Sequence, residues 1–179
     1  MIHTSAVVES NTIGKNVTIK EFAIIRKHVV LGNNVIIHPH VVIEDGVEIG
    51  ENTEIYPGVY IGKPPKSTGS IARPITFRKQ VNIGPDCLIG PNSIIYYDVV
   101  INNNTLIGDG ASIREKCKIG SYTIIGRYVT VNYATEIGNE VKIMDHSWLA
   151  GNMVIDDHVF ISGGVLTAND NLMGEDGYE

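Results

Sequence analysis

The chain has 179 residues, of which 43% are hydrophobic and 19% charged, a composition that fits one folded domain with a sizeable core. It contains no apolar run of about 18 residues, and its first residues lack a basic stretch followed by an apolar core. The sequence therefore predicts no membrane span and no secretory signal, and it favours the cytoplasm. The net charge of −6 disfavours broad binding to nucleic acids, because phosphate neutralisation needs clustered cations.

The first predicted element is a run of hexapeptides over residues 7–61, in which every sixth residue is aliphatic. A residue of small or modest size follows four places later, so the two side chains lie on the same side of an extended chain. A helix would instead need apolar residues at three- and four-residue spacing. A short strand and a bend every six residues, repeated three times, close a triangular coil. The run therefore predicts an all-β solenoid of stacked coils.

The phase of the repeat breaks once, because 22 residues separate Ile61 from Ile83, four more than one coil. A small repair keeps Ile71 and Phe77 in register and ejects residues 67–70. A larger repair removes the whole segment 63–79 from the solenoid. In both cases a loop protrudes, and it holds five of the 14 basic residues and no acidic residue: Lys63, Lys66, Arg73, Arg78 and Lys79.

The repeat resumes over residues 83–161, again with every sixth residue aliphatic. The two runs together predict about eight coils. A β-helix domain should occupy residues 1–167, followed by a polar C-terminal tail over 168–179. Aliphatic residues one coil apart should lie one above another, as in the column Ile89, Ile107 and Ile125.

The two cysteines, Cys87 and Cys117, fall at inward positions on different faces of the predicted solenoid. They lack the close spacing of metal ligands, so we expect two buried free thiols. The histidines also lack the spacing by which a γ-class carbonic anhydrase gathers three of them on zinc. No metal site is predicted.

The motif [LIV]-G-x-x-[small]-x, repeated over nearly the whole chain, resembles that of the left-handed parallel β-helix (hexapeptide-repeat) acyltransferase superfamily. The segments IGDGASIREKCKIG and VTVNYATEIGNEVKIMDHSWLAGNMVIDDHVFISGGVLTAND are most similar to acetyltransferases that modify nucleotide-linked amino sugars. The resemblance implies left-handed coils and a homotrimer with active sites between neighbouring prisms. It also implies acetyl-CoA as co-substrate and N-acetylation of a nucleotide-linked sugar, with O-acetylation of a sugar as the runner-up.

The resemblance also suggests where acetyl-CoA binds. In this superfamily the cofactor lies along the later coils, its pantetheine arm held largely by backbone groups, and a loop often reaches across to the neighbour's site. The segment 63–79 is the candidate for that loop, because phosphates need local cations in an acidic protein. The residues expected to bind the cofactor are Lys63, Lys66, Arg73, Gly151 and Gly163.

Acyl transfer needs a base that accepts the proton of the nucleophile. Many relatives place a catalytic histidine in the pattern H-D-x-x-[IV]-G, but the matching positions here are Tyr133 and Ala134. The nearest acid–histidine pair is Asp145-His146, so His146 is the candidate base and Asp145 its orienting partner. Alternatively, His146 is only a surface or trimer-contact residue. The acceptor amine would then be deprotonated by solvent or by the product thiolate.

Five further residues are candidates for binding the acceptor. Asn169 and Asp170 resemble an Asn-Asp pair of related sugar N-acetyltransferases, although such pairs also commonly fix turns. The others are candidates for sugar or phosphate binding, or else for ladder and interface contacts: Arg114, Glu115 and Asn132.

Two alternatives concern the function as a whole. A sugar-nucleotide pyrophosphorylase carries such a prism after a nucleotide-binding domain, which this sequence lacks. A non-catalytic β-helix scaffold is the main alternative to an enzyme, because the chain departs from the usual histidine position and ends soon after residue 170. No nucleic-acid or membrane partner is expected.

Overall fold

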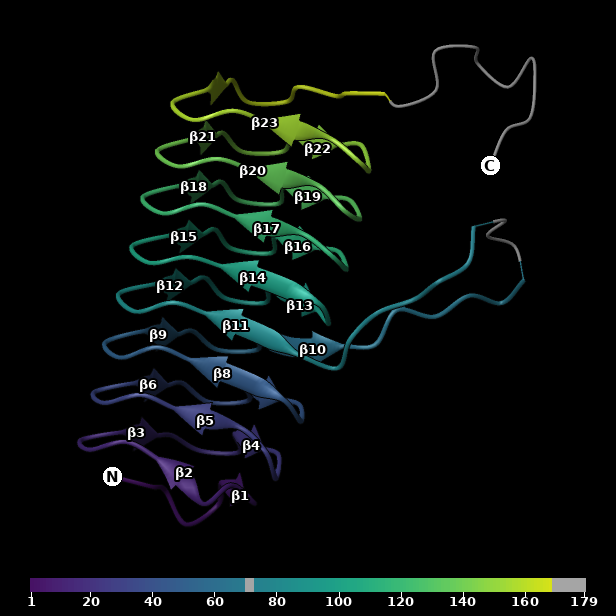
Figure 1. The fold of residues 1–179 in the computed structure, drawn as a ribbon. Coiled ribbons are helices and arrows are strands. Elements are labelled where there is room, and N and C mark those ends of the chain that lie inside the picture. Colours follow the sequence, from purple (N-terminus) through teal and green to yellow (C-terminus); the bar gives the residue numbers. More distant parts are fainter. Residues whose placement is uncertain (70–72, 169–179) are drawn as a thin grey trace.

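The computed structural model describes residues 1–69 and 73–168, and Figure 1 shows their arrangement. The described chain winds as a left-handed β-helix of about eight turns, with no helix among its elements. The predicted fold class is thus confirmed. The described residues hold no helix that could cross a membrane.

Three parallel sheets of eight short strands each form the sides of the prism. Sheet 1 contains β1 (Val7–Val8), β4 (Ile24–Ile25), β7 (Val42–Ile43), β10 (Tyr60–Lys63), β13 (Ile94–Tyr96), β16 (Ser112–Ile113), β19 (Thr130–Val131) and β22 (Trp148–Leu149). Sheet 2 contains β2 (Thr12–Ile13), β5 (Val30–Leu31), β8 (Val47–Ile49), β11 (Val81–Ile83), β14 (Val99–Ile101), β17 (Lys118–Ile119), β20 (Glu136–Ile137) and β23 (Val154–Ile155). Sheet 3 contains β3 (Thr18–Ile19), β6 (Ile36–Ile37), β9 (Glu54–Ile55), β12 (Leu88–Ile89), β15 (Leu106–Ile107), β18 (Ile124–Ile125), β21 (Lys142–Ile143) and β24 (Phe160–Ile161).

Three corners join the sheets, and each is named here by a feature that it carries. The loop corner leads from sheet 1 to sheet 2 and includes residues 44–46, 62–80, 96–98, 114–116, 132–134 and 150–152. The asparagine corner leads from sheet 2 to sheet 3 and includes residues 14–16, 32–34, 50–52 and 138–140. The histidine corner leads from sheet 3 back to sheet 1 and includes residues 38–40, 126–128, 144–146 and 162–164.

Columns of aliphatic side chains fill the interior of the prism. Ile89 pairs with Ile107, which pairs with Ile125, and all three are fully buried. The predicted column is therefore confirmed. Branched side chains suit these strands because they pack well on a pleated surface, and each fully buried one contributes ~1.5–3 kcal/mol.

Buried hydroxyl and thiol groups seal the corners from inside. Thr105 donates its Oγ1 hydrogen to the Gly120 carbonyl at 2.9 Å, and the Cys117 thiol lies 3.0 Å from the Asn132 carbonyl oxygen. Both cysteines are buried and free, as predicted. Burial raises the pKa of Cys117 to about 12, so its thiol stays protonated at neutral pH.

The asparagine corner shows why the turns favour asparagine. Asn16, Asn34 and Asn52 have φ values of 58–59°, a left-handed conformation that asparagine tolerates better than most residues. Their side-chain amides form a ladder, with Asn34 Nδ2 donating to Asn52 Oδ1 at 2.9 Å. The corner thus stacks as regularly as the strands do.

The protruding loop follows the larger of the two predicted repairs. Ile61 still pairs with Ile43, and Val81 pairs with Val47, so the segment 62–80 takes the place of one corner (Figure 1). The smaller repair, which kept Ile71 and Phe77 in register, is wrong. Phe77 instead stacks on Tyr97 outside the ladder, with the ring centroids 5.9 Å apart, where its ring still contacts the core.

Candidate functional site at the loop corner

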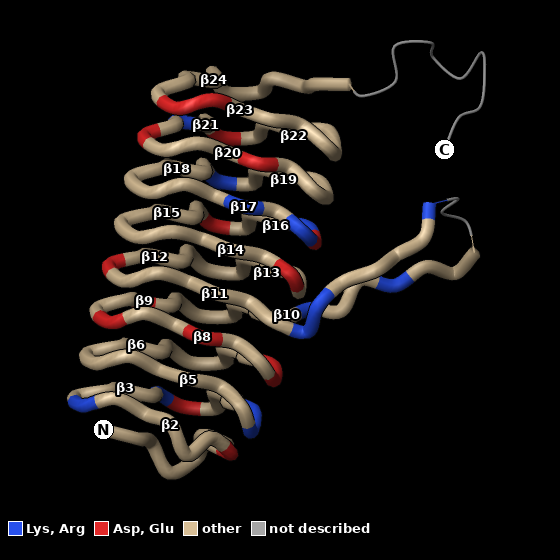
Figure 2. Tube along the Cα trace, in the orientation of Figure 1, with Lys and Arg blue, Asp and Glu red and all other residues tan. Residues whose placement is uncertain are grey.

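The basic loop lies beside the loop corner of later coils. Figure 2 shows its lysine and arginine residues in blue, with no acidic residue in its described part. Arg73 of the loop reaches Glu115, in the corner between β16 and β17. Lys116 of the same corner donates a hydrogen bond from Nζ to the Thr76 hydroxyl at 2.7 Å. The loop therefore packs against its own prism.

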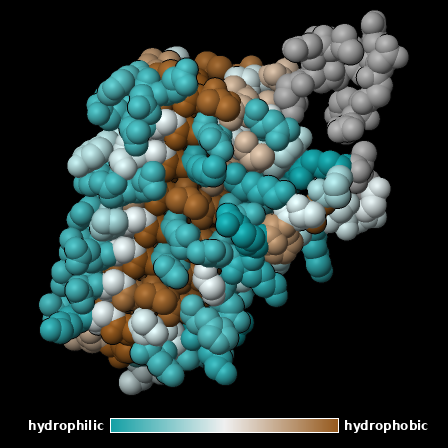
Figure 3. Space-filling view, in the orientation of Figure 1, coloured by the Kyte–Doolittle hydropathy of each residue, from teal (hydrophilic) through white to brown (hydrophobic). Residues whose placement is uncertain are grey.

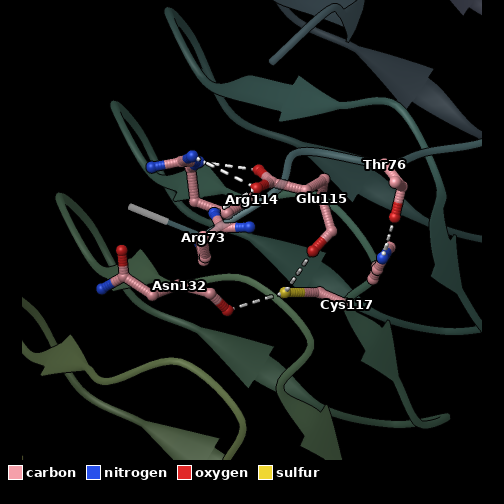
Figure 4. Close-up of polar contacts among 7 residues, drawn as sticks. Arg73, Thr76, Arg114, Glu115, Cys117 and Asn132 are labelled. Carbon is pink, nitrogen blue, oxygen red and sulfur yellow. Dashed lines mark hydrogen bonds and ion pairs between the residues drawn. The ribbon is translucent and has the colours of Figure 1, made fainter. Parts of the chain in front are cut away.

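The centre of this contact is the buried carboxylate of Glu115 (Figure 4). Its side chain is only 1% exposed, and it accepts hydrogen bonds from Arg73 Nη2 at 2.5 Å and Arg114 Nε at 2.9 Å. Burial alone would raise the pKa of Glu115, but the hydrogen bonds from the two guanidinium groups outweigh burial and lower it. Glu115 is therefore ionised at neutral pH.

Two tyrosine rings flank the guanidinium groups. Arg73 Cζ lies 3.5 Å from the ring centroid of Tyr133, in cation–π contact, and Arg114 Cζ lies 5.0 Å from that of Tyr96. Lys63 Nζ lies 4.9 Å from the same Tyr96 ring. The rings thus fix the positions of three cations.

Gly151 makes room for one of these rings. A Cβ atom at position 151 would lie 2.6 Å from Tyr133 Cζ, closer than packed atoms allow. Tyr133 and Gly151 stand one coil apart in the same corner column, and Glu115 stands one coil before Tyr133. The glycine therefore lets the Tyr133 ring lie where Arg73 stacks on it.

Asn132 also belongs to this corner, but its side chain is turned to the prism. Its Nδ2 donates to the Leu149 carbonyl at 2.7 Å, one coil onward. Its own carbonyl oxygen is the one that the Cys117 thiol approaches (Figure 4). The ladder role considered for Asn132 thus accounts for both contacts.

The candidate base lies on the histidine corner, in a different setting. Asp145 accepts hydrogen bonds from the Arg127 backbone N–H at 2.8 Å and from the Arg127 guanidinium, which together lower the pKa of Asp145. His146 stacks on Tyr128, with ring centroids 5.3 Å apart. Asp145 is thus oriented toward Arg127, and the imidazole of His146 is held by an aromatic ring.

The predicted site residues therefore divide between two corners. The loop corner brings together Lys63, Arg73, Arg114, Glu115, Asn132 and Gly151. The histidine corner holds Asp145, His146 and Gly163, on the other side of sheet 1. Lys66 is exposed in the loop, and Asn169 and Asp170 lie outside the described residues.

Sequence reasoning misses the aromatic partners of the cations. It does not single out Tyr96, and it notes Tyr133 only as a departure from the histidine pattern. Writing the sequence in rows of one coil would place Tyr133 between Glu115 and Gly151 in a single column.

A second feature that the sequence does not suggest lies on the asparagine corner. A hollow of about 620 Å³ is lined by Tyr122, Glu140, Lys142, His158, Val159 and Phe160. His158 Nδ1 lies 3.3 Å from Glu140 Oε2, but both side chains are at least 60% exposed. An exposed pair of this kind is weakly held. Among the described residues, no three potential ligands converge on a metal position.

Comparisons with known proteins agree with this architecture. A family model described as bacterial transferase hexapeptide (six repeats) matches residues 28–63, and one described as the GMPPB C-terminal domain matches residues 71–175. No curated protein matches the chain significantly.

Solved structures with the same fold include sugar acyltransferases. LpxA of Bacteroides fragilis, a UDP-N-acetylglucosamine acyltransferase, has a TM-score of 0.75 at 24% identity, covering 94% of this chain and 67% of its own. The UDP-N-acetylglucosamine acyltransferase of Francisella novicida has a TM-score of 0.64 at 26% identity, covering 95% of this chain and 63% of its own. A mutant of the GDP-perosamine N-acetyl transferase of Caulobacter crescentus, in complex with CoA and GDP-perosamine, has a TM-score of 0.59 at 17% identity. The match covers 70% of this chain and 51% of that protein.

The fold and the repeat define the class of protein: this chain is a left-handed β-helix protein built from hexapeptide repeats, and residues 28–63 match the hexapeptide transferase model. Because the second model matches more than half of the chain, the chain belongs to the GMPPB C-terminal domain family. It spans about half to two thirds of the length of the three solved proteins.

Proposed function

We propose that this chain is an acyl-CoA-dependent acyltransferase that N-acetylates an amino group on a nucleotide-linked sugar. Membership of the hexapeptide-repeat superfamily supports acyl transfer. The observation that carries the proposal is the group of cations on the loop corner, in a chain of net charge −6. Both acyl-CoA and a nucleotide-linked sugar bring phosphates that such a group would bind.

The chemistry asks for few protein groups. The acceptor amine attacks the thioester carbonyl, the carbon–sulfur bond breaks, and the sulfur leaves as a thiolate. His146 is the proposed base that accepts the amine proton, and Tyr128 holds its ring in place. Asp145 pairs with Arg127 and also interacts electrostatically with His146, so it stays the proposed partner of the base.

The two corners can cooperate only between chains, so the proposal includes a homotrimer. On one prism, sheet 1 separates Arg73 and Glu115 from His146. A cyclic trimer places different surfaces of two subunits against each other, which would set the loop corner of one beside the histidine corner of the next. Figure 3 shows a hydrophobic band along the prism between hydrophilic edges, a surface that a neighbouring prism would cover.

A sugar hydroxyl is the second candidate acceptor. The Francisella novicida protein, 26% identical to this chain, is a UDP-N-acetylglucosamine acyltransferase and keeps this alternative open. The test is a panel of nucleotide-linked amino sugars and their hydroxyl counterparts, incubated with acetyl-CoA and followed by release of free thiol. Turnover of the hydroxyl sugars alone would replace N-acylation with O-acylation. Absence of acetyl-CoA binding at millimolar concentration in calorimetry would favour the scaffold.

His146→Gln tests the proposed base. We expect kcat to fall about 10²–10⁴-fold, the range for loss of general-base catalysis. His158→Gln is the matched control, because it removes the other late-coil histidine that has an acidic neighbour. A kcat within about threefold of wild type for His146→Gln would exclude that residue as base and leave solvent or the product thiolate in the role.

A further inference from the structure

We propose that the guanidinium groups of Arg73 and Arg114, both held on the buried carboxylate of Glu115, form a binding site for a diphosphate ester. The choice of a diphosphate from acyl-CoA or from a nucleotide-linked sugar rests on the proposed function. The site itself rests on the geometry of the loop corner.

Charge is the first argument. Lys63, Arg73, Arg114 and Lys116 gather at one corner, and Glu115 is the one acidic group that the arginines contact in the described chain. Like charges brought together repel one another, and one carboxylate leaves most of this repulsion unbalanced. An anion with two or more charges bound here would balance it.

Unused hydrogen-bond donors are the second argument. A guanidinium carries five N–H donors in a planar fork. Arg73 uses one of them on Glu115, and Arg114 uses two, within the described residues. The two side chains are 21% and 24% exposed, so a ligand can reach the remaining donors. Such forks match phosphate oxygens in pairs, which favours two adjoining phosphates over a single one.

Preorganisation is the third argument. Glu115 holds both guanidinium groups from the prism side (Figure 4). The Tyr133 ring, 3.5 Å from Arg73 Cζ, fixes the plane of the Arg73 guanidinium. Arginine side chains lose considerable rotamer entropy when they are ordered on ligand binding. Here that ordering is already present before a ligand binds. Glu115 is therefore a positioning residue of the site.

Calorimetric titration with inorganic pyrophosphate tests the site without acyl transfer. We expect binding that weakens as salt rises and that is stronger than binding of inorganic phosphate. Arg73→Ala should weaken it at least about tenfold, because a charge-assisted contact is lost. Arg26→Ala is the matched control, since Arg26 sits on the same corner in an early coil and pairs with Glu9 and Glu44. Absence of pyrophosphate binding at millimolar concentration, or equal loss in the control, would overturn the site.

Glu115→Gln tests the positioning role by the sign of its effect. If the carboxylate merely competes with the ligand for the guanidinium groups, its neutralisation should tighten pyrophosphate binding. If it positions them, binding should weaken about tenfold although one negative charge has been removed. Thermal denaturation of each variant confirms that it is folded. Arg73→Lys, which keeps the charge and loses the fork, should weaken binding in a folded protein even where Glu115→Gln is unstable.

Two further titrations identify the source of the diphosphate. CoA and a nucleoside diphosphate such as UDP or GDP each compete with pyrophosphate if they occupy the site. If Arg73→Ala lowers the affinity for only one of these two ligands, that ligand is the one that the Arg73–Arg114 site binds. Pyrophosphate binding without any acyl transfer would refute the proposed function and leave the site intact. Acyl transfer without pyrophosphate binding would refute the diphosphate site and leave the proposed function intact.

Discussion

Glu115 is the residue on which the loop corner depends, because a buried carboxylate requires charged partners. Taking a carboxylate out of water is costly, and only good hydrogen-bond geometry offsets the cost. Arg73 comes from the loop and Arg114 from the chain next to Glu115, so one ionised group joins the loop to the prism. Removing Arg73 or Arg114 would leave the buried carboxylate with a single guanidinium partner.

The lowered pKa of Glu115 predicts a pH-dependent stability. Its ion pairs stabilise the fold fully above the ordinary pKa of 4.5, and this contribution is lost as the pH falls through the lowered folded value. We expect Glu115→Gln to lower the free energy of unfolding at pH 7, measured by urea denaturation, by about 1–3 kcal/mol. The difference should shrink in acid below pH 4.5. Glu136→Gln is the control, because the ion pair of Glu136 with Lys118 is exposed. This substitution should change the free energy of unfolding very little at either pH.

Gly151→Ala tests the space beneath the Tyr133 ring. The new Cβ would lie 2.6 Å from Tyr133 Cζ, so the ring must move and Arg73 loses its stacking partner. We expect the free energy of unfolding, measured with urea, to fall by about 1–3 kcal/mol, the usual cost of overpacking. Pyrophosphate binding should also weaken. Gly163→Ala should cost less, because its Cβ approaches no atom closer than 3.2 Å. Equal effects of the two substitutions would refute this role of Gly151.

At the scale of the element, the short strands depend on how the corners between them are closed. Each two-residue strand is followed by a turn, and a buried hydroxyl or thiol often satisfies a corner carbonyl. Among the described residues, no buried side-chain polar atom lacks a hydrogen-bond partner. The coils can therefore stack without polar groups stranded in the core.

Thr105→Val tests this closure of the corner. Valine has nearly the same shape but no hydroxyl, so the Gly120 carbonyl loses the donor that now lies 2.9 Å away. We expect the free energy of unfolding to fall by about 1–3 kcal/mol, the cost of a buried group left unsatisfied. Thr105→Ser keeps the hydroxyl and controls for the packing of the methyl group. A Thr105→Val protein as stable as wild type would show that the bond contributes nothing.

The loop is the element that departs from the repeat. Replacing Lys63, Lys66 and Arg73 together with alanine should raise the Michaelis constants for the phosphate-bearing substrates about tenfold or more, because charge-assisted contacts are lost. Steady-state kinetics with both substrates measures the change. Unchanged constants would remove the loop from the site.

At the scale of the whole molecule, the proposed intersubunit site predicts complementation. At substrate concentrations below the Michaelis constants, Arg73→Ala chains should keep about a tenth of wild-type activity and His146→Gln chains far less. Refolded together in equal amounts, the two should reach about a quarter of wild-type activity. A site is complete only where an intact Arg73 of one chain meets an intact His146 of its neighbour. Light scattering should give three times the 19.5 kDa chain mass. If the protein is a monomer, or if mixed trimers recover no activity, the loop corner and the histidine corner do not form one site between subunits.

The sequence by itself determined the solenoid, its number of coils, the aliphatic columns and the burial of Cys87 and Cys117. A six-residue period fixes which side chains point inward, and each coil repeats the one before it. The period also located the loop, but between Ile61 and Ile83 it ceases to constrain the chain, so the extent of the excursion was left open.

Only the tertiary structure decided which polar residues meet. Arg73 reaches Glu115 across 42 positions of sequence, through a loop that follows no period. Asp145 and His146 are adjacent in sequence yet lie with Arg127 and Tyr128, because residues one coil apart stack while neighbours on a turn diverge. Contacts made by the repeat follow from its spacing, whereas contacts made by the loop depend on the fold as a whole.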